Sequence, residues 1–220
     1  MFRNREDAAR RLAGELRRYA GKNPLILAVP RGAVPMGRVI ADELDGELDV
    51  VLVHKLGAPG NPEYAIGAVS EEGEVLLRKG HGVDLSDRYV TEEKERQLRV
   101  LRNRRAQYTP DRPPADPTGR VVVVVDDGIA TGATLKAALQ AVRAKKPARL
   151  IAAVAVAPEE SLAEMKSIAD EVACLATPAF FFAVGEFFAD FRQVDDDEVI
   201  ETLRSSAGRA TPPPVLGKES

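Results

Sequence analysis

The sequence has one cysteine, little net charge and no long apolar segment, and each scarcity excludes a class of protein. With Cys174 as its only cysteine, the chain cannot form an internal disulfide, which is typical of proteins from reducing compartments. The formal net charge of −3 gives no indication of binding to nucleic acid or to an anionic membrane. No apolar run approaches the length that spans a bilayer, and residues 1–16 lack the layout of a signal peptide. We therefore expect a cytoplasmic protein.

Two common phosphate-binding motifs are also missing. The pattern GxxxxGK[ST] does not occur, which excludes a nucleoside-triphosphate P-loop, and no GxGxxG follows the first apolar run. Any phosphate site in this chain must therefore be built differently.

Apolar runs alternate with segments of helical pattern along the chain. The runs are apolar throughout, so both faces of the strands that they form must be covered. We therefore expect an α/β fold with a mostly parallel sheet flanked by helices. Strands are expected at about residues 25–29, 49–53, 120–125, 149–157 and 171–176, and a hairpin at 65–70 and 74–78. One helix is expected to begin at the turn 30–37 and to end near residue 46. The other helices are expected at about residues 4–20, 91–108, 133–145, 159–169 and 195–205.

The chain is long enough for one such domain with an elaboration. We expect a single domain over residues 1–205 and a disordered tail over 206–220, where Pro212–Pro214 lie. The segment 109–119 carries four prolines and is expected to be an extended connection.

The stretch VVVVVDDGIATGATLKAAL, residues 121–139, is the most informative part of the sequence. Asp126 and Asp127 follow an apolar strand, at the end where ligands bind in parallel sheets. The turn that follows consists of small residues and leads into a helix, whose first N–H groups and dipole favour a phosphate. The carboxylates would repel that phosphate, so they must face ribose hydroxyls, a divalent metal or a developing cation. The candidate phosphate-binding residues are Gly128, Ile129, Ala130, Thr131, Gly132, Ala133 and Thr134.

Residues 121–134 resemble the signature of the type I phosphoribosyltransferases, in which a hydrophobic strand precedes two aspartates, two further residues and Ala-Thr-Gly-x-Thr. The resemblance implies that fold, with 5-phosphoribosyl-1-pyrophosphate (PRPP) as substrate and Mg²⁺ held mainly through PRPP rather than by a dedicated set of protein ligands. The turn Arg31, Gly32, Ala33 resembles the family's pyrophosphate loop, although the family often has a second glycine in place of Ala33.

Other segments occupy the places of further family features. Residues 55–70 stand where the family has a flexible loop that closes over the substrate, and their Gly and Pro content suits hinges. Residues 177–191, which hold six of the seven phenylalanines between 180 and 191, stand where a small C-terminal hood binds the acceptor base. A helical insertion at about 81–119 has no counterpart in the minimal family core.

The resemblance implies transfer of the phosphoribosyl group to a nucleobase-like nitrogen acceptor, with release of pyrophosphate. Asp126 and Asp127 would hold ribose hydroxyls and stabilise positive charge on the sugar, while Arg31 and Lys55 would be cations for the pyrophosphate. In the 6-oxopurine enzymes an aspartate stands where this chain has Ala130. Either Glu186 or Asp190 of the hood replaces that aspartate, or the acceptor is not a 6-oxopurine, which is the reading we favour.

Other functions share the same motif. A regulator that senses PRPP and binds RNA or a protein partner would also keep this motif, and the basic residues of the 91–108 helix would then matter. Those residues, Arg105 among them, are expected to form a solvated face, and an RNA contact there is the minority reading. A side activity that breaks down PRPP without an acceptor is a third alternative. A homodimer would fit helices and a hood that lie near the site.

Overall fold

Five parallel strands form the central sheet in the order β2-β1-β6-β7-β8. The structure is a computed structural model that describes residues 1–77 and 86–206. The parallel pairing confirms the expected α/β fold and places β6 in the middle of the sheet. The strands are β1 (Leu25–Ala28), β2 (Glu47–Val50), β6 (Val121–Asp126), β7 (Arg149–Val156) and β8 (Glu171–Ala176).

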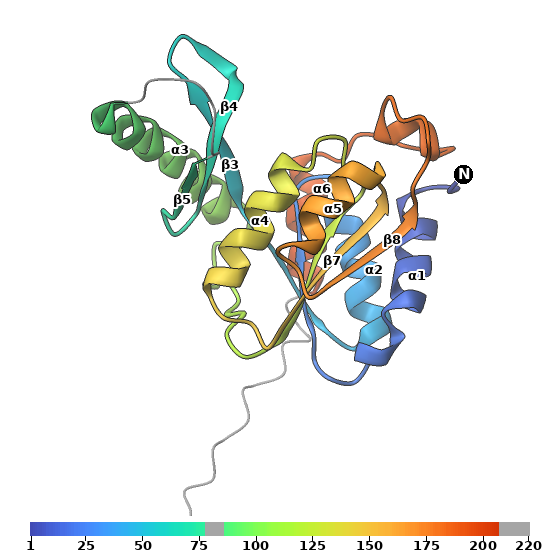
Figure 1. Cartoon of the computed structure of the whole chain (residues 1–220). Coiled ribbons are helices and arrows are strands. Elements are labelled where there is room, and N and C mark those ends of the chain that lie inside the picture. The colour runs from blue at the N-terminus through green and yellow to red at the C-terminus, as the bar shows by residue number, and fades with distance from the viewer. Residues whose placement is uncertain (78–85, 207–220) are drawn as a thin grey trace, which may run out of the picture.

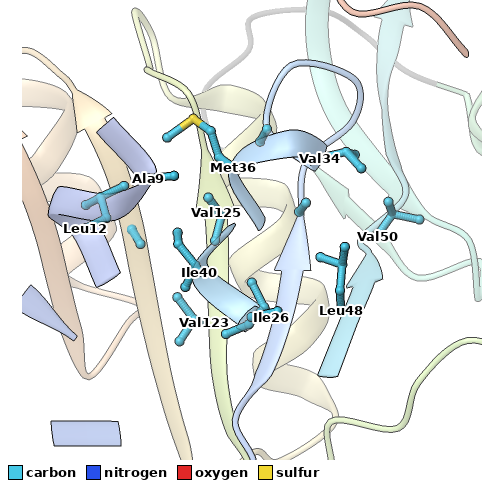
Figure 2. Packing of buried hydrophobic residues seen from close by; sticks show 14 of the residues in the cluster. Ala9, Leu12, Ile26, Val34, Met36, Ile40, Leu48, Val50, Val123 and Val125 are labelled. Carbon is cyan, nitrogen blue, oxygen red and sulfur yellow. The ribbon is translucent and has the colours of Figure 1, made fainter. Parts of the chain in front are cut away.

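Helices cover both faces of this sheet (Figure 1). On one face, Val123 and Val125 of β6 pack with Ile40 of α2 and with residues of α1, as Figure 2 shows. On the other face, Val122 and Val124 pack with α4 and α5. The valine run is therefore buried on both sides, which is why it is apolar throughout. The helices are α1 (Arg5–Glu15), α2 (Val34–Leu44) and α6 (Asp196–Ser206) on the first face, and α4 (Ala133–Ala144) and α5 (Glu159–Lys166) on the second.

A second, antiparallel sheet corrects two expectations from the sequence. It contains β3 (Val53–Ala58), β4 (Asn61–Ser70) and β5 (Val75–Leu77). The apolar run 49–53 is not one strand, because β2 ends at Val50 and Val53 already begins β3. Residues 55–70, expected as a flexible loop, are mostly paired as the β3–β4 hairpin.

The helix α3 (Asp87–Tyr108) packs on this second sheet through Leu98 and Leu101. Together they extend from one end of the central sheet (Figure 1). The helix begins earlier than expected because the Ser86 side chain accepts a hydrogen bond from the Tyr89 N–H. Residues 81–85 of the expected 81–119 insertion, residues 78–80 before them, and residues 207–220 of the expected tail lie outside the described residues. Residues 110–119 contain no helix or strand. Throughout the described ranges, no helix is long and apolar enough to cross a membrane.

One buried ionic network attaches α3 to the central sheet. The Arg105 guanidinium donates to a carboxylate oxygen of Asp49 at 2.9 Å, to one of Glu71 at 2.6 Å and to the Val50 carbonyl at 2.9 Å. The Asp49 side chain is 1% exposed and also accepts from the Ala115 N–H at 2.9 Å. The sequence groups Arg105 with the solvated or RNA-facing residues of its helix, and that reading is wrong for this residue because its charge is balanced inside the protein.

We expect Arg105→Met to lower the free energy of unfolding by about 3–5 kcal/mol, because it removes the nearest cation from the buried carboxylates of Asp49 and Glu71 and leaves Asp49 with only Arg112 at 3.5 Å. Urea denaturation followed by circular dichroism measures the change. The matched control is Arg102→Met, since Arg102 is an exposed arginine of the same helix and its loss should stay within about 0.5 kcal/mol. If Arg105→Met and Arg102→Met lose the same unfolding free energy, Arg105 does not attach α3 to the central sheet.

Candidate functional site

The two aspartates lie at the carboxyl end of the central strand. β6 ends at Asp126, whose Oδ1 accepts a hydrogen bond from the Asp127 N–H at 2.9 Å. The turn then reaches α4 through Gly132, which has a φ of 71°. No side chain caps this helix, so its first N–H groups are directed at the turn and favour an anion there.

The turn between Asp127 and α4 is anchored at one residue and exposed at others. Ile129 is buried, and its N–H donates to the Val156 carbonyl at 3.0 Å, so this residue holds the turn against β7. The exposed residues of the expected phosphate loop are Ala130, Thr131, Ala133 and Thr134. Their backbone and hydroxyl groups are the ones placed to meet a phosphate.

Two glycines allow neighbouring segments to approach this turn closely. A Cβ on Gly32 would lie 2.2 Å from Asp127 Oδ2, and a Cβ on Gly128 would lie 2.6 Å from Val184. Real Cβ atoms do not come so near, so a larger residue at Gly32 or Gly128 would push the neighbouring segments of the chain apart. Gly32 follows Arg31, whose peptide bond with Pro30 is cis, while Ala33 is buried at the start of α2.

Arg5 of α1 contacts Asp127, although sequence reasoning did not find it. Its Nε donates to Asp127 Oδ2 at 2.8 Å, and its Nη1 donates to the Arg192 carbonyl at 2.6 Å. The guanidinium lies 3.8 Å from the centre of the Phe191 ring. No local pattern could have identified this residue, because 122 positions separate it from Asp127.

A cavity of about 460 Å³ opens beside these groups. It brings together the acidic motif, the expected pyrophosphate loop and residues at or just after the hood. Its lining consists of Arg5, Arg31, Gly32, Asp127, Val184, Phe191, Gln193 and Val194. Of the expected cations only Arg31 lies there, since Lys55 is on β3 of the second sheet, paired in register with Ala68.

The hood is fixed to the N-terminal segment. The Phe2 N–H donates to the Phe187 carbonyl, and the Ala189 N–H donates to the Phe2 carbonyl, both at 2.8 Å. Of the phenylalanines in the hood, Phe191 lines the cavity, whereas Phe180 and Phe182 are each 83% exposed. Glu186 and Asp190 of the hood do not contribute to the lining.

Burial makes the carboxyl groups of the acidic pair unusually hard to ionise. It raises the pKa of Asp126 well above the ordinary value, and the adjacent charge of Asp127 raises this pKa further. Burial also raises the pKa of Asp127, but the Arg5 guanidinium opposes that rise. Negative charge at the strand end therefore depends on a cation nearby.

The donors at this site fit a magnesium ion that keeps most of its ligands from a substrate. Within residues 1–77 and 86–206, no group of three or more His, Cys, Asp or Glu side chains could hold a metal by itself. Asp126 and Asp127 supply hard carboxylate oxygens, and Mg²⁺ is commonly bound through one or two carboxylates plus substrate phosphates.

The parallel sheet thus carries at its carboxyl end an acidic pair followed by a turn whose N–H groups favour an anion. The sequence matches the family model described as "Phosphoribosyl transferase domain" over residues 2–188. The chain belongs to that family.

Similar proteins agree with this assignment. The proteins MT0597 and Rv0571c, from two strains of Mycobacterium tuberculosis and provisionally named phosphoribosyl transferases, are each 42% identical over 205 residues. Those 205 residues are 92% of this chain and 46% of each relative, so the chain spans about half the length of the curated relatives that it matches. The crystal structure of TT1426 from Thermus thermophilus is 44% identical, with a TM-score of 0.84, covering 93% of this chain and 98% of that one.

We expect Asp126→Asn to stabilise the ligand-free protein, and the gain to grow with pH. Because the folded state raises the pKa of Asp126, it retains a proton that the unfolded chain releases. The unfolding free energy of the wild type therefore falls as pH rises from the ordinary carboxyl pKa through the raised one, by about 1.4 kcal/mol per pH unit. Asparagine does not titrate and can still accept from the Asp127 N–H.

Urea denaturation between pH 4 and pH 8 measures this difference. Asp116→Asn is the control of opposite sign, because hydrogen bonds from Thr118 hold the pKa of the exposed Asp116 below its ordinary value. If the gain in unfolding free energy from Asp126→Asn stays constant between pH 4 and pH 8, the pKa of Asp126 is not raised in the folded protein.

Proposed function

We propose that this protein is a magnesium-dependent phosphoribosyltransferase of nucleotide metabolism, which transfers the 5-phosphoribosyl group of PRPP to a nitrogen atom of a nucleobase-like acceptor. The observation that carries the proposal is the position of Asp127. Asp127 lines the cavity together with Arg31 and Gly32 of the loop after β1, and it is followed in the chain by the turn that leads into α4. A ligand with a phosphate at one end, a sugar in the middle and a pyrophosphate at the other matches that order of groups.

Each part of the site then has a chemical task. The exposed residues between Ala130 and Thr134 bind the 5′-phosphate, and Asp126 and Asp127 accept hydrogen bonds from the ribose hydroxyls. Arg31 binds the pyrophosphate. The bond from the anomeric carbon to pyrophosphate breaks, a bond to the acceptor nitrogen forms, and that nitrogen loses a proton.

The carboxylates also act on the charge that develops in the sugar. As the bond to pyrophosphate breaks, positive charge appears on the ribose ring, and fixed negative groups beside it lower the barrier by a few kcal/mol. When bound, Mg²⁺ would neutralise the leaving group and raise the fraction of ionised Asp126 and Asp127, which would hold it together with substrate oxygens.

We expect pyrophosphate release from PRPP and magnesium to require one acceptor from a panel of nucleobases. Asp127→Asn should lower kcat/KM by roughly 100-fold, because an amide cannot provide the negative charge that the sugar requires. A coupled pyrophosphate assay measures the rate, with Asp190→Asn as a hood variant outside the cavity. PRPP binding without release under any condition would favour the sensing regulator, and release without an acceptor would favour simple breakdown of PRPP. If the protein neither binds PRPP nor releases pyrophosphate, the proposal is wrong.

The lining of the cavity supports an acceptor other than a 6-oxopurine. Ala130 offers no carboxylate for the purine proton. Glu186 and Asp190 do not line the cavity, and the Asp190 carboxylate accepts from the Arg192 N–H. Among the lining residues only Asp127 is acidic, and Arg5 already pairs with it.

Hypoxanthine and guanine should therefore be poor acceptors, at least about 100-fold below the preferred base in kcat/KM, because the site lacks a group to take the purine proton. The pyrophosphate assay with these two bases tests this, and Ala130→Asp is the variant that restores a carboxylate at the exposed position. Robust turnover of hypoxanthine by the wild type would overturn the inference.

A further inference from the structure

Arg5 lines the cavity, yet each nitrogen of its guanidinium has a protein partner. Nε and Nη2 lie 2.8 Å and 2.7 Å from Asp127 Oδ2, and Nη1 lies 2.6 Å from the Arg192 carbonyl oxygen. The side chain is 12% exposed. An arginine with a protein oxygen close to each of its three nitrogens is held in one position, although two of its five N–H groups have no partner among these contacts.

The flat face of the guanidinium is also occupied. It lies 3.8 Å from the centre of the Phe191 ring, a separation at which a cation is attracted by the aromatic face. Phe191 and Arg192 belong to the end of the hood and the residue after it, whereas Asp127 belongs to the acidic motif. Arg5 therefore joins the part of the cavity that would meet the acceptor to the part that would meet the ribose.

We propose that Arg5 is a positioning residue of the transferase reaction, which fixes the Asp127 carboxylate in one orientation toward the cavity and holds the hood segment against it. The inference rests on the proposed function. It adds that Arg5 covers one ring face of Phe191 and that the centre of the Phe188 ring lies 4.9 Å from the centre of this ring, so an acceptor can contact Phe191 only where these two neighbours leave it open. Arg5 acts through Asp127 and Phe191, without touching the reacting atoms.

Kinetics provide a readout that a purely structural role would not change. Two nitrogens of Arg5 hold Asp127 Oδ2, so loss of Arg5 frees the carboxylate to rotate without removing it. Because Arg5 does not touch the reacting atoms, its loss should lower kcat while the KM for PRPP changes little.

The experiment compares Arg5→Gln and Arg5→Lys with Arg10→Gln. Arg10 lies on the same helix, is 57% exposed and pairs with Glu6. Arg5→Gln should lower kcat roughly 10- to 100-fold with little change in the KM for PRPP, because Asp127 loses its fixed orientation. Arg5→Lys should recover only part of kcat, since an ammonium group keeps the charge but cannot reproduce the planar contacts. Arg10→Gln should match the wild type.

A second measurement separates this inference from the proposed function. Proton–nitrogen-15 NMR of the Arg5 Nε–H in ligand-free protein needs no turnover. This proton should exchange with water at least about 10-fold more slowly than the Nε–H of the 57% exposed Arg10, because it donates to Asp127. If the wild type releases no pyrophosphate with any acceptor, the proposed function fails, while the exchange rates still test the contact. The inference is overturned if Arg5→Gln, folded by circular dichroism, equals Arg10→Gln in kcat and KM, or if the Nε–H groups of Arg5 and Arg10 exchange at the same rate. If Arg5→Gln does not fold, Arg5→Lys decides the same question, and a kcat equal to the wild type overturns the inference.

Discussion

Asp126 ends the middle strand of a sheet that has helices on both faces, and Asp127 follows it, so two adjacent carboxyl groups are largely buried. Ionising both is costly, and the remaining features of the site reduce that cost. Arg5 pairs with Asp127, and the Asp127 N–H donates to Asp126. Gly32 has no side chain because a Cβ there would collide with Asp127. The identities of Arg5 and Gly32, which are far from Asp127 in the sequence, are thus explained by their contacts with its buried carboxylate.

Features encoded locally could be predicted from the sequence. The valine run, the two aspartates and the small residues after them lie within one short stretch, 121–134, so the strand, the turn and the helix start follow from that stretch alone. Arg5 could not be found in this way, because its contacts with Asp127 and Arg192 join distant segments of the chain. The pattern around Arg5 is that of an ordinary amphipathic helix start.

Composition gave the wrong result where it was used in place of spatial context. Gly and Pro between residues 55 and 70 suggested a hinged loop, yet most of that segment is paired, and the β3–β4 ladder absorbs its irregularity as shifts in register around Gly57. The basic residues of α3 suggested a solvated face. For Arg105 that reasoning failed, because the balancing charges come from Asp49 and Glu71, which are far from it in sequence. The network they form sets where the second sheet joins the first.

The two arginines of the cavity differ in how firmly the protein holds them. Arg5 is 12% exposed and has short contacts from each nitrogen, so moving it would leave Asp127 uncompensated. Arg31 is 40% exposed and has a 3.4 Å contact with Asp196, itself 50% exposed, so that pair contributes at most about 1 kcal/mol. Tyr108 keeps Asp196 in place through a 2.5 Å hydrogen bond. Under the proposed function, a pyrophosphate carries more negative charge than one carboxylate, so Arg31 can exchange Asp196 for it at little cost while Arg5 stays in position. The cavity would then combine one arginine that can exchange its carboxylate partner for an anion with one that keeps an acidic group oriented toward the sugar.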